Sequence, residues 1–226
     1  MNAVKIIVSL LMLANMPATA QTKFYFKPSA GVGTGNLSQR SQTINTTTYA
    51  KTPATYGGLA LGYRVNRFDI SAGVTYMRIG YKITNIMFAD INNTVDSGSV
   101  TYYYNQLLLP VLVGYDMPLN NRFHFIPQTG IALWYTLNGR YELETMKTHR
   151  KETIPANAVS NFGNTMGVYS TTHLNISYDV SPKLAVSVAP SLYYMITTFN
   201  RSPLSNSSQR LYSITLDLGL SMNLGQ

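Results

Sequence analysis

Three polar side chains that could do chemistry together lie in the stretch THLNISYD: His173, Ser177 and Asp179. A serine, a histidine and a carboxylate can act as nucleophile, general base and orienting partner in acyl transfer. The stretch alternates polar and apolar residues, which predicts a β-strand. His173 and Ser177 would then share a face about 13 Å apart, whereas a base must approach its nucleophile to about 3 Å. We therefore interpret His173 as part of a polar network.

The other two histidines offer no clearer site. His124 is predicted inside, near a strand end, and His149 lies in the charged stretch ELETMKTHRKE. That stretch is most simply a solvated loop. The alternative is a divalent-ion site made by Glu142, Glu144, His149 and Glu152. Zinc spacing, a phosphate-binding glycine loop and a catalytic elbow are all absent from the sequence, so no catalytic residue, metal or cofactor is expected.

The last strand-like stretch, LYSITLDLGLSMNLGQ, indicates the surroundings of the chain. Every second residue from Tyr212 to Leu224 is apolar. Strands of soluble proteins usually run about 5–6 residues, so this length favours a strand that crosses a membrane. The composition agrees, since 45% of the 226 residues are hydrophobic and only 12% are charged. After the N-terminus, no apolar run reaches the roughly 20 residues of a spanning helix.

The N-terminal 20 residues are typical of a secretory signal peptide. Lys5 precedes an apolar core from Ile6 to Leu13, and the small residues Ala18-Thr19-Ala20 follow it. Cleavage before Gln21 is predicted, with a retained N-terminal helix as the alternative. The domain assignment is a signal peptide over Met1–Ala20 and one outer-membrane barrel domain over Gln21–Gln226. Without cysteine, neither a disulfide framework nor a cysteine-linked lipid anchor is available.

Eight segments alternate or run apolar and are predicted to be strands: Lys23–Thr34, Tyr56–Val65, Phe68–Lys82, Val100–Asp116, Arg122–Leu137, Met166–Val180, Leu184–Phe199 and Arg210–Leu224. The connections are alternately long and short. Asn66-Arg67, Met117–Asn121 and Ser181–Lys183 are tight turns, whereas Gly35–Thr55, Ile83–Ser99, Asn138–Thr165 and Asn200–Gln209 are long and polar. This pattern predicts an all-β fold, an eight-stranded antiparallel up-and-down transmembrane β-barrel, with its short turns periplasmic and its long loops extracellular.

Alternation also predicts which side chains face the lumen. The expected lumenal polar network is Lys27, Arg64, Asp69, His173, Asp179 and Asp217. Because the first strand must pair with the last, we expect an ion pair between Lys27 and Asp217; the alternative is that Asp217 meets water near the lower rim. Rings near strand ends are predicted to form interfacial girdles, namely Tyr76, Tyr81, Tyr102, Tyr103, Tyr104, Tyr115, Trp134, Tyr135, Tyr141, Tyr178 and Tyr212.

Two segments carry a family resemblance. TYYYNQLLLPVLVGYDM, Thr101 to Met117, has an aromatic start, a Leu-Pro-apolar core and a closing tyrosine. FHFIPQTGIALWY, Phe123 to Tyr135, has proline and then glycine before an apolar end. Both resemble strands of porin-like small outer-membrane barrels, and the whole mature chain is similar to OmpA- and OmpX-like barrels. The resemblance implies a fold and an outer-membrane location but no reaction. Mid-strand Pro110, Pro127 and Pro190 are expected to cause bulges.

These observations lead to a functional expectation. An eight-stranded barrel is wide enough only for side chains to fill it, so a general diffusion pore is not expected. The formal net charge is +8, but the basic residues are scattered and no nucleic-acid motif accompanies them. We expect a monomeric, non-enzymatic protein that contacts outer-membrane lipid and lipopolysaccharide, and an external protein or surface ligand through its loops, in a structural or adhesive role. The alternatives are a lipid-modifying barrel enzyme and a narrow channel.

Overall fold

The structure is a computed structural model, and it describes residues 22–40, 48–89, 95–145, 149–155, 164–199 and 208–224. The predicted signal peptide, Met1–Ala20, lies outside the described residues. Over the described ranges, no helix has the length and apolar character needed to cross a membrane. The strands of this part of the chain are β1 Thr22–Arg40, β2 Thr48–Ala50, β3 Thr52–Val65, β4 Phe68–Ala89, β5 Val95–Tyr115, β6 Met117–Pro118, β7 Phe123–Thr145, β8 His149–Ile154, β9 Met166–Ser181, β10 Leu184–Met195 and β11 Ser208–Asn223.

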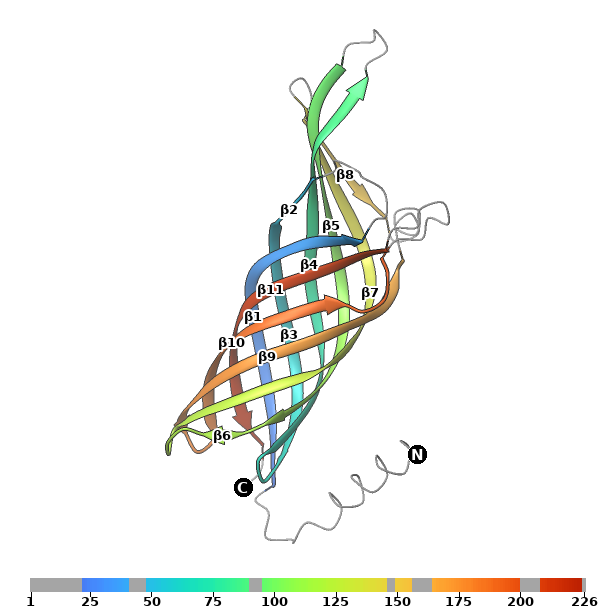
Figure 1. Ribbon diagram of the computed structural model, residues 1–226. Helices are drawn as coiled ribbons and strands as arrows, with labels where there is room; N and C mark the ends of the chain where they lie inside the picture. The colour runs from blue at the N-terminus through green and yellow to red at the C-terminus, as the bar shows by residue number, and fades with distance from the viewer. Residues whose placement is uncertain are drawn as a thin grey trace, which may run out of the picture.

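Eight of these strands form a closed ring. Each long strand pairs antiparallel with the next along the chain, in the order β1, β3, β4, β5, β7, β9, β10 and β11, and β1 pairs with β11 to close the cylinder. Figure 1 shows the strands inclined around a common axis, with the short turns at one end. The predicted eight-stranded up-and-down barrel is therefore confirmed. The short strands β2, β6 and β8 attach to the ring at β4 and β7.

The strands run further into the predicted long loops than the sequence pattern indicated. The β4–β5 ladder continues to the pair Ala89 and Val95, and the β5–β7 ladder continues to Gly98 and Thr145. On the edge of β7, β8 adds one more strand. These strands form a sheet beyond the barrel rim, at the top of Figure 1, which we call the extension. The prediction of loops there was wrong because hydrogen-bonded pairing with a neighbour can extend a strand where alternation of hydrophobicity has ended.

The two faces of the ring have the predicted chemistry. On β11, Leu218 is 64% exposed and its neighbour Asp217 only 4%. On β4, Ile70 and Val74 are exposed on the outside while Asp69 is fully buried. The same alternation holds on β9 and β10. A cylinder with an apolar exterior and a polar interior is suited to a lipid bilayer.

The aromatic girdles are only partly where they were predicted. At the short-turn end three ring pairs lie on neighbouring strands: Phe24–Tyr63, Phe68–Tyr115 and Phe123–Tyr178. Tyr81, Tyr104 and Trp134, however, point inward and are at most 7% exposed, so their girdle assignment was wrong. Successive side chains of a strand point to opposite faces. Trp134 points inward because it lies between the outward-facing Leu133 and Tyr135.

These inward rings belong to an apolar cluster that fills the lumen toward the extension. We call it the aromatic plug, and its buried members include Met77, Ile79, Tyr81, Tyr104, Leu108, Trp134, Tyr169, Tyr193, Met195, Phe199 and Leu211. The rings are in contact: the centroid of Tyr104 lies 4.9 Å from that of Phe199 and 6.3 Å from that of Tyr81. An interior of this kind excludes water from one part of the cylinder and leaves the polar residues at the other end.

The predicted proline bulges are a further correction. The β4–β5, β7–β9 and β9–β10 ladders keep the same register on both sides of Pro110, Pro127 and Pro190. Register shifts occur elsewhere, between Ile83 and Ile86, Asn105 and Gln106, and Leu184 and Ala185. A proline removes one N–H donor, and a ladder can lose that single hydrogen bond without gaining an extra residue.

The exterior assignment can be tested with a charge. Leu133→Arg, on the outer face of β7, should lower the free energy of unfolding in lipid vesicles by about 2–4 kcal/mol, because arginine would enter hydrocarbon. Leu119→Arg is the matched control, since Leu119 is similarly exposed but lies in a short turn. Urea titration of the refolded barrel measures both changes. Equal effects of the two substitutions would contradict the membrane-facing exterior.

Candidate functional site

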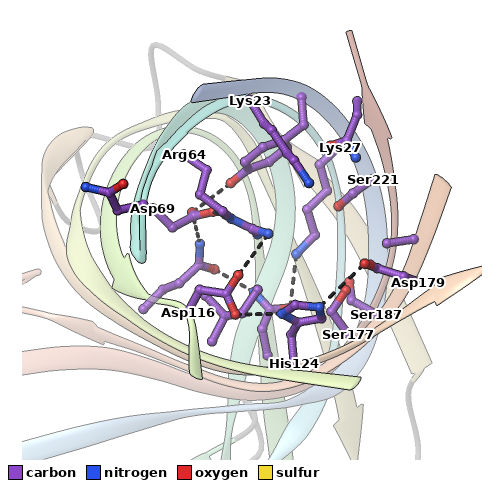
Figure 2. Close-up of a pocket in the computed structure, with 17 residues that line it drawn as sticks. Lys23, Lys27, Arg64, Asp69, Asp116, His124, Ser177, Asp179, Ser187 and Ser221 are labelled. Atoms are coloured by element: carbon purple, nitrogen blue, oxygen red, sulfur yellow. Dashed lines mark hydrogen bonds and ion pairs between the residues drawn. The ribbon is translucent and has the colours of Figure 1, made fainter. Parts of the chain in front are cut away.

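Below the aromatic plug, at the short-turn end, the lumen contains a polar cavity of about 460 Å³. Figure 2 shows side chains from several strands converging on it. Its lining is almost entirely polar or charged: Lys23, Tyr25, Lys27, Arg64, Asn66, Asp69, Asp116, His124, Ile126, Gln128, Asn175, Ser177, Asp179, Ala185, Ser187, Ser221 and Asn223. Lys27, Arg64, Asp69 and Asp179 from the predicted network are therefore brought together here, whereas His173 and Asp217 lie deeper in the lumen.

Asp69 is the most heavily bonded acid in the cavity. Arg64 contacts Asp69 Oδ2 through Nε at 3.2 Å and through a terminal nitrogen at 3.1 Å. On the other oxygen, Tyr25 donates at 2.7 Å and Gln128 at 2.8 Å. The tight turn at Asn66, which has a left-handed φ of 54°, folds β3 back on β4 and sets Arg64 opposite Asp69. These contacts fix the position of a fully buried carboxylate.

The position of Tyr25 depends on a glycine on the next strand. The Tyr25 ring lies against Gly62, where any added Cβ would collide with the ring. Gly62 pairs with Tyr25 across β1 and β3. A residue without a side chain therefore creates the space in which Tyr25 can lie flat and reach Asp69.

A second set of charges joins the network to β7 and β9. The free terminal nitrogen of Arg64 lies 3.1 Å from Asp116 Oδ2. His124 Nδ1 lies 2.8 Å from Asp116 Oδ1, and its Nε2 lies 3.5 Å from Asp179 Oδ2. Asp116 and His124 do not belong to the predicted network. The signal that could have identified them is their position at the ends of adjacent strands, where the short pairing of β6 with β7 sets His124 opposite Pro118.

Lys27 does not make the predicted ion pair with Asp217. Its ammonium donates instead to Asn175 Oδ1 at 3.0 Å, and Asn175 in turn donates to Gln128. The register of β1 on β11 explains the correction. Asp217 is opposite Gly31 rather than Lys27, and four residues of strand separate the two positions by about 13 Å. The carboxylate of Asp217 packs directly on Gly31.

Asp217 and His173 form a smaller site higher in the lumen. Asp217 is only 4% exposed, so the alternative that it meets water near the lower rim is also wrong. His173 Nδ1 lies 2.7 Å from Ser191 Oγ and 3.7 Å from Asp217 Oδ2. Serine and aspartate thus approach the same ring nitrogen, whereas a catalytic relay uses one nitrogen for each. Sequence analysis missed Ser191, which reaches His173 only through the pairing of β9 with β10.

The acidic residues considered as an ion site lie in the extension, where basic side chains engage them. Glu142 contacts Arg140 at 2.8 Å and Lys151 at 3.6 Å, and Lys82 lies 3.6 Å from Glu144. Glu152 pairs with Arg150 and accepts a hydrogen bond from Tyr141, which lowers the pKa of the carboxyl group. Among the residues that the structure describes, no three His, Cys, Asp or Glu side chains are arranged to hold a metal ion.

Comparisons with known proteins bear on the fold alone. No protein-family profile and no curated protein matches the chain. Among solved structures it is similar to the outer-membrane protein OprG of Pseudomonas aeruginosa, with 11% identity over 89% of this chain and 96% of that one and a TM-score of 0.47. It is also similar to neisserial surface protein A, with 13% identity over 89% and 97% of the two chains and a TM-score of 0.40. The outer-membrane protease OmpT of Escherichia coli has 9% identity over 89% and 97%, with a TM-score of 0.46.

These values are too low to carry an argument about fold or function. The strand order, the closure of β1 on β11 and the apolar exterior establish the architecture independently. The expected resemblance to small eight-stranded outer-membrane barrels is confirmed at the level of fold.

The charge network should contribute strongly to stability. Arg64→Met would leave Asp69 and Asp116 without their shared cation, at an expected cost of about 3 kcal/mol in the free energy of unfolding. Arg67→Met, in the adjacent turn, is the matched control because Arg67 is exposed and lies outside the cavity lining. Chemical denaturation in detergent or vesicles measures both. A similar loss in the two variants would show that the cavity network is not the cause.

The role of Gly62 is open to a separate test. Gly62→Ala should displace the Tyr25 ring and weaken its hydrogen bond to Asp69, with a loss of about 1–3 kcal/mol as that buried group loses a partner. The double variant Gly62→Ala, Tyr25→Phe should lose less than the sum of the two single changes, since both act on one contact. Additive losses would contradict the proposed link.

Proposed function

We propose that this chain is a monomeric outer-membrane protein, without enzymatic activity, that serves the cell envelope by binding partners at the outer surface. The observation that carries the proposal is the extension: β4, β5, β7 and β8 continue as a sheet beyond a barrel whose lumen is closed at that end by the aromatic plug. A closed interior and a projecting sheet together favour contact over transport.

The charges of the extension are suited to contact with polar or charged partners. One side of its sheet presents Lys82, Arg140, Glu142, Glu144 and Lys151 close together. Arg150 and Lys151 on the edge strand β8 are among its most exposed charges, with side chains 64% and 48% exposed. An edge strand with exposed charges is protected against uncontrolled sheet-to-sheet pairing. Its side chains pair with Glu142 and Glu152, yet they stay exposed and can meet an external protein or surface ligand.

Basic residues on the outer face near the extension support contact with lipopolysaccharide. Arg78 lies over the ring of Tyr103 at 4.3 Å, and Arg210 lies 6.0 Å from the ring centroid of Tyr194. Cations beside interfacial tyrosines are positioned to meet anionic head groups. These cations support an orientation with the extension on the extracellular side and the short turns in the periplasm, as is usual for outer-membrane barrels.

The two alternatives have less support. An enzyme needs a nucleophile next to a base that a third group orients, but Ser191 and Asp217 approach the same nitrogen of His173. A narrow channel needs a continuous polar path, but the plug residues Tyr104, Tyr169 and Phe199 are fully buried across the lumen.

Surface binding should depend on the edge of the extension. Arg150→Gln with Lys151→Gln should reduce attachment of expressing cells to immobilised host-cell or extracellular-matrix surfaces, because two exposed charges are removed. The matched control is Arg122→Gln with Lys183→Gln, which removes two exposed cations from the short-turn end.

Replacement of 141–154 by a short Gly-Ser turn tests this whole part of the extension. Sensitivity to detergents is a parallel measure of envelope integrity. Attachment and integrity unaffected by every variant would overturn the proposal.

Conductance and lipid turnover test the alternatives. In planar bilayers the parent protein should stay at the baseline conductance, since the plug closes the lumen.

Mass spectrometry of cellular lipids should show the same species with the parent and with Ser191→Ala. A steady open level in the first measurement, or a product lost with Ser191 in the second, would favour the channel or the enzyme.

A further inference from the structure

A groove of about 500 Å³ lies on the outer wall where the first and last strands meet. We call it the seam groove. Its sides are outward-facing apolar side chains of β1, β10 and β11: Pro28, Ala30, Val186, Leu218 and Leu220. Its floor is made of Ser29, Ser187 and Gly219, which belong to the inward-facing set of the same strands.

The outward-facing residues of β1 explain why the wall is recessed here. Pro28 and Ala30 are small, and Ala30 is paired with the larger Leu218 of β11. The backbone of Ser29, Gly219 and Ser187, which are paired across the three strands, forms the floor. Around them larger side chains stand outward, such as Val32 at 67% exposure and Leu218 at 64%. On the lumen side the space at Gly219 is already occupied, because an added Cβ would lie 2.6 Å from Lys27 Cε and 2.8 Å from Ser187 Oγ.

The backbone ladder is incomplete at the same place. Between β1 and β11 the pairing passes from Phe26 and Met222 directly to Ser29 and Gly219. The unchanged register would put Lys27 opposite Ser221 and Pro28 opposite Leu220, but these two pairs are missing from the described ladder. Pro28 has no N–H to donate. Hydrocarbon offers backbone groups no alternative partner. The β1–β11 closure is therefore weak at Lys27 and Pro28.

The surroundings of the groove restrict what can occupy it. Pro28 lies four residues from Phe24, about 13 Å along the strand, and Phe24 belongs to the ring pairs at the short-turn end. The groove therefore opens inside the apolar band rather than at its rim. A polar ligand would lose its hydration there without gaining partners, whereas an unfilled apolar recess forfeits dispersion contacts. A flexible hydrocarbon chain satisfies both conditions.

A second copy of the chain is a poorer occupant. A stable protein interface buries about 800 Å² on each partner and involves roughly 20–30 residues a side. The seam groove is lined by eight residues of three strands. The volume of the groove lies within the range of small-ligand sites, about 300–1,000 Å³. A site of this size suits one chain of a lipid.

We propose that the seam groove binds one acyl chain of a phospholipid, which stays with the barrel and covers the weak stretch of the β1–β11 closure. The lipid would exchange more slowly than its neighbours because its chain fills a recess rather than a flat wall. This inference concerns the transmembrane wall and is independent of the proposed surface-binding role.

Native mass spectrometry can count such a lipid. The protein is reconstituted in vesicles of phosphatidylethanolamine and phosphatidylglycerol, then extracted in mild detergent. Ala30→Phe fills the groove, and Ala72→Phe is the matched control because Ala72 is an exposed alanine on the outer face of β4. We expect the parent and Ala72→Phe to retain one phospholipid per barrel, and Ala30→Phe to weaken retention at least about tenfold, or about 1.4 kcal/mol.

Two further measurements keep the test decisive. Val186→Phe fills the groove from β10, so it replaces Ala30→Phe if that variant does not fold. Added phospholipid should raise the Tm of the detergent-solubilised parent and of Ala72→Phe, but not of the groove-filled variant. The proposal is overturned by a parent that retains no lipid, by equal retention in filled and control variants, or by a dimer that forms through this face.

Discussion

The constraint on which the whole structure depends is that backbone hydrogen-bonding groups in hydrocarbon must find their partners within the protein, and each group left without one is costly. Within a bilayer, a sheet can meet this condition only by closing on itself, so β1 must find β11 at the opposite end of the chain. Once that pairing is made, every strand is inclined, and every second side chain is forced into a lumen that is narrow for eight strands. The register of β1 on β11 then decides which lumenal residues can meet, which is why Asp217 lies on Gly31 instead of reaching Lys27.

The lumen solves its packing problem in two different ways along its axis. Toward the extension, large rings and methionines pack against one another, and the burial of their apolar surface excludes water. Toward the short turns, the lumen contains charged side chains that must be paired. Arg64 is shared between Asp69 and Asp116, and each acid gains further donors. A polar network in a cavity open to water costs less than the same charges in a dry interior, so it is placed at the end where solvent can reach it.

Period-two alternation was enough to identify the eight strands, their two faces and the polar character of the lumen at the short-turn end, because a strand has only two sides. It could not give the relative shift of neighbouring strands, and contacts between strands depend on that shift. The Asp217 assignment failed for this reason, and Ser191 was missed although it lies beside His173. The girdle assignment of Trp134 failed for another reason. An aromatic residue near a strand end suits both an interfacial girdle and an interior plug, and the face of the strand on which it lies decides between them.

The membrane-spanning part of the molecule must keep its shape, whereas the extension is free to change. Inside the membrane, closure, alternation and a filled lumen leave little choice, and the residues that violate the pattern, such as Pro28 at the seam, need a compensating contact. Beyond the rim, water satisfies any unpaired backbone group, so the extension is not bound by closure and its edge strand β8 can display charges such as Arg150 and Lys151. A barrel built in this way can vary its extension without changing its fold, and the proposed function therefore rests on the extension rather than on the lumen.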